Sequence, residues 1–158
     1  MVIEIRKSSR HSKITGDFGE AVVLYWLSKH GFECARVDHT GIDIIARNPQ
    51  NQELMGISVK SRSRSLETEG ASLVIPRSNL AKAQQACKAF GCQPYYAIVV
   101  DAGRLINVFL LSMQHLLQMH PRGGKTINWS MGPKALAEYS ADPHIKHFVF
   151  NTDTKCWW

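Results

Sequence analysis

GIDIIAR, at residues 41–47, and LMGISVK, at residues 54–60, are the two stretches that decide how this chain folds. Both are short and rich in aliphatic side chains, and the five residues after the first are dense in turn formers, NPQNQ at residues 48–52. This pattern predicts two antiparallel strands joined by a turn. Each strand also holds one charged side chain that its apolar surroundings do not explain, Asp43 in the first and Lys60 in the second.

The spacing of the charged residues predicts where they meet. Side chains alternate between the two faces of a strand, so Ser58 and Lys60 point the same way. If the strands pair through the turn, Asp43 lies opposite the Ile57–Ser58 region. Its carboxylate and the Lys60 ammonium then share one end of one sheet face. A structural ion pair near a strand end is the alternative explanation of the same two residues.

Further elements are predicted on either side of this pair. They are a helix over residues 17–30 closed by Gly31, a strand over 32–37, a polar basic loop over 61–65, a helix from 78 or 79 to 90, strands over 95–100 and 105–111, and a short helix over 112–120. The order is helix, three strands, helix and two strands, or α-β-β-β-α-β-β. It predicts an α/β fold in which a central mixed β-sheet is flanked by helices.

Length and composition favour one domain and a polyanionic partner. The chain has 158 residues, of which 44% are hydrophobic and 20% are charged, and a net charge of +6. We expect a basic N-terminal arm at residues 1–13, a core at 14–120, and a C-terminal extension at 121–158 that packs on the same domain. No stretch has the length of a membrane helix and the N-terminus lacks a signal-like apolar run, so we expect a cytoplasmic protein. The sequence GGKT at 123–126 lacks the first glycine of a phosphate-binding loop.

The strand pair resembles a known family. Residues 41–46 followed by Gly56-Ile57-Ser58-Val59-Lys60-Ser61 look like the motif of the PD-(D/E)XK, or restriction-endonuclease-like, nuclease superfamily. The preceding helix, with Glu20 in GDFGEA, is similar to the first helix of the Holliday junction resolvase-like branch. The resemblance covers residues 14 to 112. It implies a Mg²⁺-dependent endonuclease, with Mn²⁺ as the substitute ion, that acts on duplex or branched DNA.

The resemblance also implies roles for individual residues. Asp43 and Glu20 would bind the metal together with the main-chain carbonyl of Val59, and Lys60 would orient or activate the attacking water. Because members of the resolvase-like branch act as dimers, a homodimer is implied as well. The basic residues beside the motif and in the N-terminal segment are candidates for phosphate contacts: Arg62, Arg64 and Lys13.

Two alternatives remain open at this stage. The family pattern places an acidic residue two positions before the lysine, where this chain has Ser58, so a charged ligand is lost and metal should bind more weakly. The chain is therefore either an endonuclease whose other carboxylates compensate, or an inactive nuclease-fold protein that only binds nucleic acid. Glu20 has its own alternative, because Asp17 and Glu20 have the spacing of a helix capping box.

Overall fold

A mixed six-stranded sheet forms the centre of the molecule in the computed structural model, which describes residues 6–65 and 67–153. The strands follow one another in the order β1-β2-β3-β5-β6-β8. Their bounds are β1 Glu33–His39, β2 Ile42–Arg47, β3 Leu54–Ser63, β5 Gln93–Asp101, β6 Leu105–Ser112 and β8 Lys146–Asn151. The β3–β5 pairing is parallel and the other four pairings are antiparallel.

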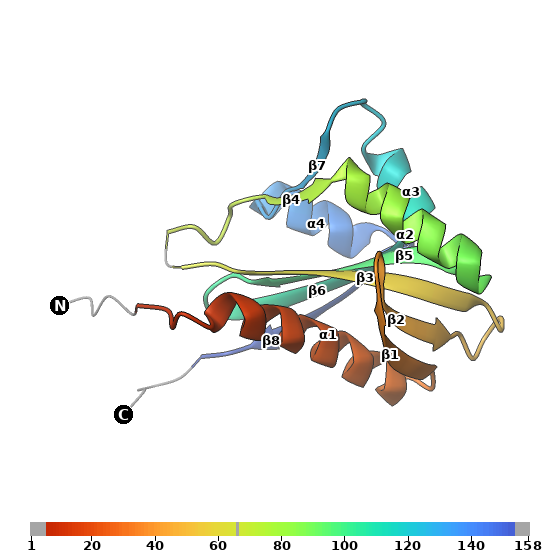
Figure 1. Ribbon diagram of the computed structural model, residues 1–158. Coiled ribbons are helices and arrows are strands. Elements are labelled where there is room, and N and C mark those ends of the chain that lie inside the picture. The colour runs from red at the N-terminus through yellow and green to blue at the C-terminus, as the bar shows by residue number, and fades with distance from the viewer. Residues whose placement is uncertain (1–5, 66, 154–158) are drawn as a thin grey trace.

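Both faces of the sheet are covered (Figure 1). The helices are α1 His11–Lys29, α2 Arg77–Phe90, α3 Met113–Met119 and α4 Pro133–Ala141. Helix α1 lies on one face, and the other three helices lie on the opposite face. A two-stranded sheet, β4 (Leu73–Pro76) with β7 (Thr126–Trp129), joins them there. Among the described residues, no helix is long and apolar enough to cross a membrane.

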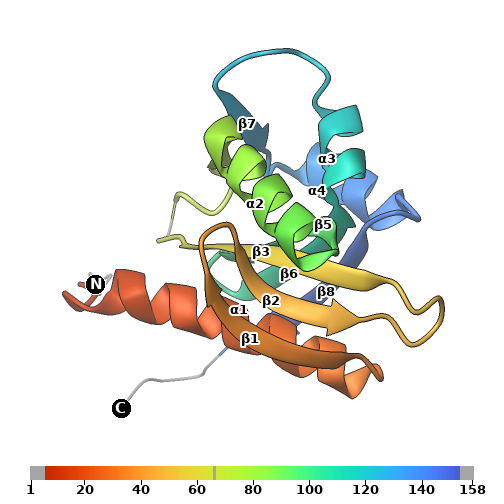
Figure 2. The ribbon, with the colours of Figure 1, turned by 45° about the vertical axis from the view of Figure 1, so that its right-hand side comes forward.

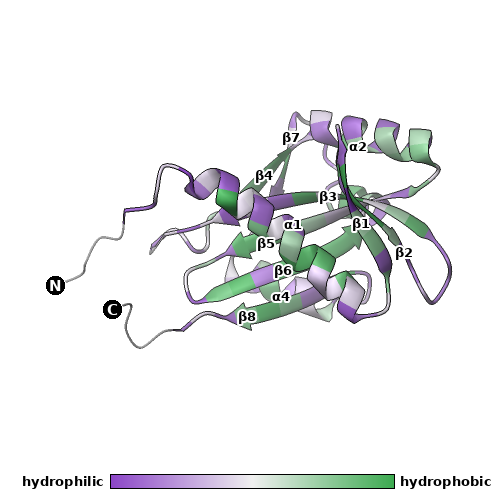
Figure 3. Ribbon diagram, turned by 60° about the horizontal axis from the view of Figure 1, so that its bottom comes forward, coloured by the Kyte–Doolittle hydropathy of each residue, from purple (hydrophilic) through white to green (hydrophobic). Residues whose placement is uncertain are grey.

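Each face of the sheet has its own hydrophobic core. On the α1 side, Val23 and Leu27 pack on Ile44, Ile57 and other apolar residues of the sheet. On the other side, strand residues that include Tyr96 pack against the three helices and the small sheet. Figure 3 shows α1 lying across hydrophobic stretches of the central strands. Alternate residues of one strand therefore serve different cores, as the period-two pattern requires.

The order of elements agrees with the prediction, and several bounds differ. Helix α1 begins at His11 rather than near residue 17, because its first turns are polar and carry no apolar periodicity that would indicate a helix. Residues 61–63 belong to β3 instead of a loop: the parallel neighbour β5 pairs with β3 as far as Ser63 and Asp101. The strands β4 and β7 were not predicted, since each has only four residues and pairs only with the other.

Candidate functional site

The carboxylate of Asp43 lies where strands β2 and β3 separate. Their ladder runs from the Arg47–Leu54 pair to the Ile44–Ile57 pair and ends there. One residue further on, the Asp43 Oδ2 atom accepts a hydrogen bond of 2.7 Å from the Val59 N–H. A side chain thus replaces the backbone partner that a continued ladder would supply. This bond fixes the carboxylate at the edge of β3, beside the Ile57–Ser58 region that the sequence predicted it to face.

Ser58 and Lys60 lie on the face of β3 that is turned toward α2. Ser58 is in register with Tyr96, and Lys60 with Ile98, whose side chains belong to the core on that side. Ser58 is 3% exposed and Tyr96 is fully buried. The Tyr96 hydroxyl has no hydrogen-bond partner among the described residues, and burial raises the pKa of Tyr96 to about 12. The position where the family pattern has an acid is therefore enclosed by an aromatic ring.

Burial and neighbouring charges shift the pKa values of Asp43 and Lys60 toward their neutral forms. Burial raises the pKa of Asp43, while the Val59 N–H, Lys60 and Arg36 oppose the rise and Glu20 adds to it. Burial also lowers the pKa of Lys60, against the attraction of Asp43. No ion pair between described residues joins Asp43 to Lys60 directly. A simple structural ion pair therefore does not account for these two residues.

Glu20 reaches this site because α1 approaches β3 closely. A Cβ atom on Gly19 would stand 1.7 Å from the Ser61 Oγ, so α1 can lie this close to β3 only with glycine at this position. The next residue, Glu20, is near enough to Asp43 to raise its pKa. The capping-box alternative is wrong, because Asp17 lies in the second turn of α1, where it pairs with Lys13 at 3.2 Å. The Glu20 carboxylate accepts hydrogen bonds from Arg36 on β1.

The donor atoms at this site suit a hard divalent cation. Magnesium ions in proteins are commonly held by one or two carboxylates together with several waters. Asp43 and Glu20 supply the carboxylates. The N–H and C=O of one residue point to the same edge of an extended strand, so the Val59 carbonyl also faces the gap that holds Asp43. Within residues 6–65 and 67–153 there is no cluster of three or more acidic, histidine or cysteine ligands, so the candidate ligands are these two carboxylates and the Val59 carbonyl.

The residues predicted to contact DNA occupy different settings. Lys13 is exposed on α1, two turns before Glu20 on the same side of the helix, and its ammonium donates to the Asp17 carboxylate. Arg62 is exposed on β3, two positions after Lys60, and its charge contributes to the lowered pKa of Lys60. Arg64 donates to the carbonyls of Ala71 and Ser72 and so holds the loop that leads to β4. Their contact with DNA stays a prediction.

Two basic residues near the site were not singled out from the sequence. Arg36 contacts Glu20, and the charge of Lys82 on α2 also lowers the pKa of Lys60. The turn between β1 and β2 lies beside α2 (Figure 2), where a Cβ atom on Gly41 would come within 2.4 Å of the Lys82 carbonyl. A cavity of about 280 Å³ between them is lined by His39, Thr40, Lys82, Gln85 and Ala86. No local pattern marks these residues, because they meet only in the folded chain.

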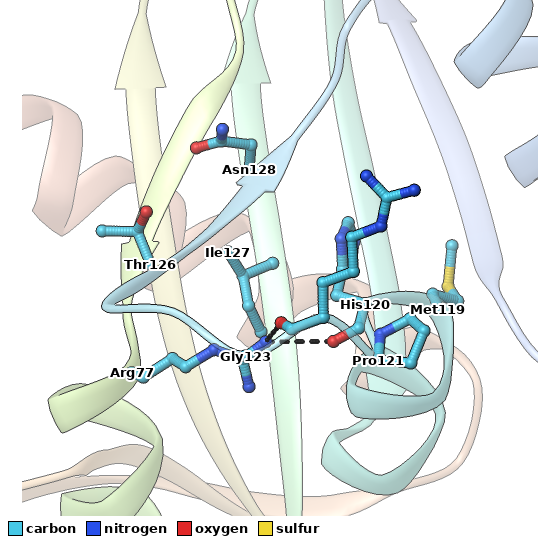
Figure 4. Close-up of a pocket in the computed structure, with 9 residues that line it drawn as sticks. Arg77, Met119, His120, Pro121, Gly123, Thr126, Ile127 and Asn128 are labelled. Carbon is cyan, nitrogen blue, oxygen red and sulfur yellow. Dashed lines mark hydrogen bonds between the residues drawn. The ribbon is translucent and has the colours of Figure 1, made fainter.

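A second cavity, of about 300 Å³, lies beside β7 and the end of α3. Its lining includes residues of the loop that carries the incomplete phosphate-binding motif at residues 123–126. Arg77 enters it, but its guanidinium donates to the carbonyls of His120 and Arg122 at 3.0 and 2.7 Å (Figure 4). This arginine holds the loop in place. The cavity shares no lining residue with the hollow beside Lys82.

Comparison with known proteins supports the fold. No protein-family model matches the sequence, and no curated protein matches it. Among solved structures, the chain is similar to Hjc, a Holliday junction resolvase from the archaeal hyperthermophile Archaeoglobus fulgidus. The TM-score is 0.55 at 21% sequence identity, over 78% of this chain and 88% of that one. The chain therefore has a mixed α/β fold of the restriction-endonuclease-like kind, as the sequence predicts.

Proposed function

We propose that this protein is a metal-dependent DNA endonuclease of the resolvase-like kind, which hydrolyses phosphodiester bonds in duplex or branched DNA. One observation carries the proposal: the Asp43 carboxylate sits in the gap between β2 and β3, bonded to the Val59 N–H, within the electrostatic reach of Lys60 and Glu20. The fold shared with an archaeal Holliday junction resolvase and the net charge of +6 are in keeping with it.

Each residue has a chemical part in this proposal. Asp43, Glu20 and the Val59 carbonyl hold Mg²⁺ or Mn²⁺, which when bound neutralises phosphate charge and makes a water more acidic. Lys60 places its amine beside the reacting phosphate. Because burial lowers the pKa of Lys60, a larger fraction of its amine is neutral than in an exposed lysine, and only the neutral amine can accept a proton. Arg62 and Lys13 contact the DNA backbone on either side.

A binding-only protein is the second candidate, and the position of Ser58 favours it. This serine is buried against Tyr96, where a larger acidic side chain would need space that the core occupies. The site then has two carboxylates for a cation, and Arg36 already contacts one of them. A nuclease fold that has lost cleavage would keep its basic surface and bind DNA without cutting it.

Cleavage of supercoiled, linear and four-way-junction DNA with Mg²⁺ or Mn²⁺ separates the two candidates. An endonuclease cuts at least one substrate, and Asp43→Asn, Glu20→Gln and Lys60→Ala each abolish cleavage. The matched control is Arg47→Gln, at the far end of β2, which should cut like the wild type. If the wild type cuts nothing with either metal but binds DNA, the binding-only candidate is correct. Cleavage that survives Asp43→Asn would mean that another site is responsible.

The assembly proposed for this chain is a homodimer, because the resemblance to resolvase-like nucleases implies two active sites on one branched substrate. Sedimentation velocity of the full chain, with and without a four-way junction, tests it. A single species with the mass of one chain at all concentrations, and one chain per junction, would contradict a dimer.

A further inference from the structure

An ion pair connects the candidate site to strand β1. The Arg36 guanidinium donates to the Glu20 Oε2 atom from Nη2 at 2.5 Å and from Nε at 3.2 Å. The pair joins α1 to β1. No other described residue forms a salt bridge with either partner. Arg36 is therefore the counter-ion of a carboxylate that the proposed function needs for a metal.

The guanidinium lies in the region where a divalent cation would bind. Glu20 and Arg36 both act on Asp43, in opposite directions: the carboxylate raises its pKa and the guanidinium lowers it. A guanidinium and a divalent cation both bind carboxylate oxygens, and the two positive charges repel each other at short distance. With the neutral Ser58 in place of an acid, two carboxylates here face two positive side chains, Lys60 and Arg36. The site has no surplus negative charge while Arg36 remains.

We propose that Arg36 competes with the divalent cation for Glu20, so that the cation binds this site by displacing the guanidinium from the carboxylate. The inference rests on the proposed function, because it requires a cation at Asp43. It assigns Arg36 a part in regulating cation affinity, which neither the sequence motif nor the fold assigns.

The exposure of the pair makes such an exchange feasible. The Arg36 side chain is 48% exposed and the Glu20 side chain 27% exposed, so water can solvate both groups when they part. Ion pairs at this exposure contribute little to stability. Arg36 stands on an outer strand of the sheet and has a long side chain that can turn to solvent. The pair therefore lowers cation affinity without excluding the cation.

The test is Mn²⁺ binding to the full chain, measured by titration calorimetry and by the electron paramagnetic resonance of free Mn²⁺. Arg36→Gln should raise Mn²⁺ affinity by about three- to tenfold, because it removes both the competing bond and a nearby positive charge. Arg36→Lys keeps the charge but loses the planar fork, and should lie between this variant and the wild type. Arg47→Gln is the control: it removes one charge from a distant arginine, which bonds to the Gln52 carbonyl, and should change little.

A second background shows whether the effect passes through Glu20. In Glu20→Gln, the carboxylate that Arg36 occupies is gone, so Arg36→Gln should raise Mn²⁺ affinity by a smaller factor than in the wild type. Equal factors in both backgrounds would mean that Arg36 acts only by long-range repulsion, and would overturn the proposal. The same conclusion follows if Arg47→Gln raises affinity as much as Arg36→Gln.

The outcomes distinguish this inference from the proposed function. Mn²⁺ binding that depends on Asp43 but is unchanged or weakened in Arg36→Gln would overturn the competition and leave the proposed metal site intact. If neither the wild type nor Arg36→Gln binds Mn²⁺, the site holds no cation, and both proposals fail. Binding that appears only in Arg36→Gln would support the competition most directly.

Discussion

Ser58→Glu is the substitution that most directly tests the site, because it restores the acid of the family pattern in a position where space is short. Ser58 is 3% exposed and lies beside the fully buried Tyr96. Replacing a hydroxymethyl group with a longer carboxylate forces the neighbouring side chains to shift, at a cost of about 1–3 kcal/mol. For a chain of this length, that cost lowers the melting temperature by about 2–12 °C without metal.

Added metal should reverse the loss. The new carboxylate contributes one negative charge to a site where Asp43 and Glu20 are opposed by two positive side chains, so Mn²⁺ affinity should rise by about ten- to a hundredfold. By linkage, this increase adds about 1.4–2.7 kcal/mol to the metal-dependent stabilisation at saturating Mn²⁺. Thermal unfolding with and without Mn²⁺ measures both effects in one experiment.

Ser58→Gln is the matched control, because glutamine has nearly the shape of glutamate and no charge. It has the same steric cost without the cost of burying a charge, so without metal it should lose no more stability than Ser58→Glu, and Mn²⁺ should stabilise it no more than the wild type. If the two variants respond alike to Mn²⁺, Ser58 does not face the cation, and the assigned geometry is wrong. If neither variant loses stability, the packing of Tyr96 against Ser58 is looser than described.

Three further expectations concern stability and DNA binding. Gly19→Ala gains helix propensity of about 1 kcal/mol but places a Cβ atom 1.7 Å from the Ser61 Oγ, so it should lower the melting temperature, and Ser61→Ala in the same chain should recover part of the loss. Burial lowers the pKa of Lys60, so the charged lysine destabilises the folded state at pH values below that lowered pKa. Lys60→Met should therefore raise the free energy of unfolding at pH 7 by about 1 kcal/mol. Denaturant titrations should show this gain shrinking as the pH rises from the lowered pKa toward the ordinary lysine value. Affinity for duplex or branched DNA should fall steeply with salt, and Arg62→Gln should reduce the slope of log K against log salt by about 1 in fluorescence anisotropy; an unchanged slope would remove Arg62 from the DNA contact.

Much of the fold was predictable because its signals are local. The turn residues between β2 and β3, the period-two pattern of both strands and the glycines that end α1 and α2 all act over a few residues. Gly31 and Gly91 adopt positive φ values of 86° and 65°, as expected of residues that follow a helix. The elements that the sequence did not indicate have weak local signals. The small strands β4 and β7, and the last residues of β3, form because a partner strand is present.

The candidate site was likewise predictable from the sequence only in part. Strand alternation and a short turn were enough to predict from the sequence that Asp43 and Lys60 lie near the same end of one strand pair, because both signals act within twenty residues. Their surroundings depend on how distant elements pack. The close approach of α1 at Gly19 brings Glu20 to Asp43, strand β1 supplies Arg36, and strand β5 places Tyr96 against Ser58. These contacts join residues of different elements, and their geometry depends on how helices and strands pack, which no local pattern of residues encodes.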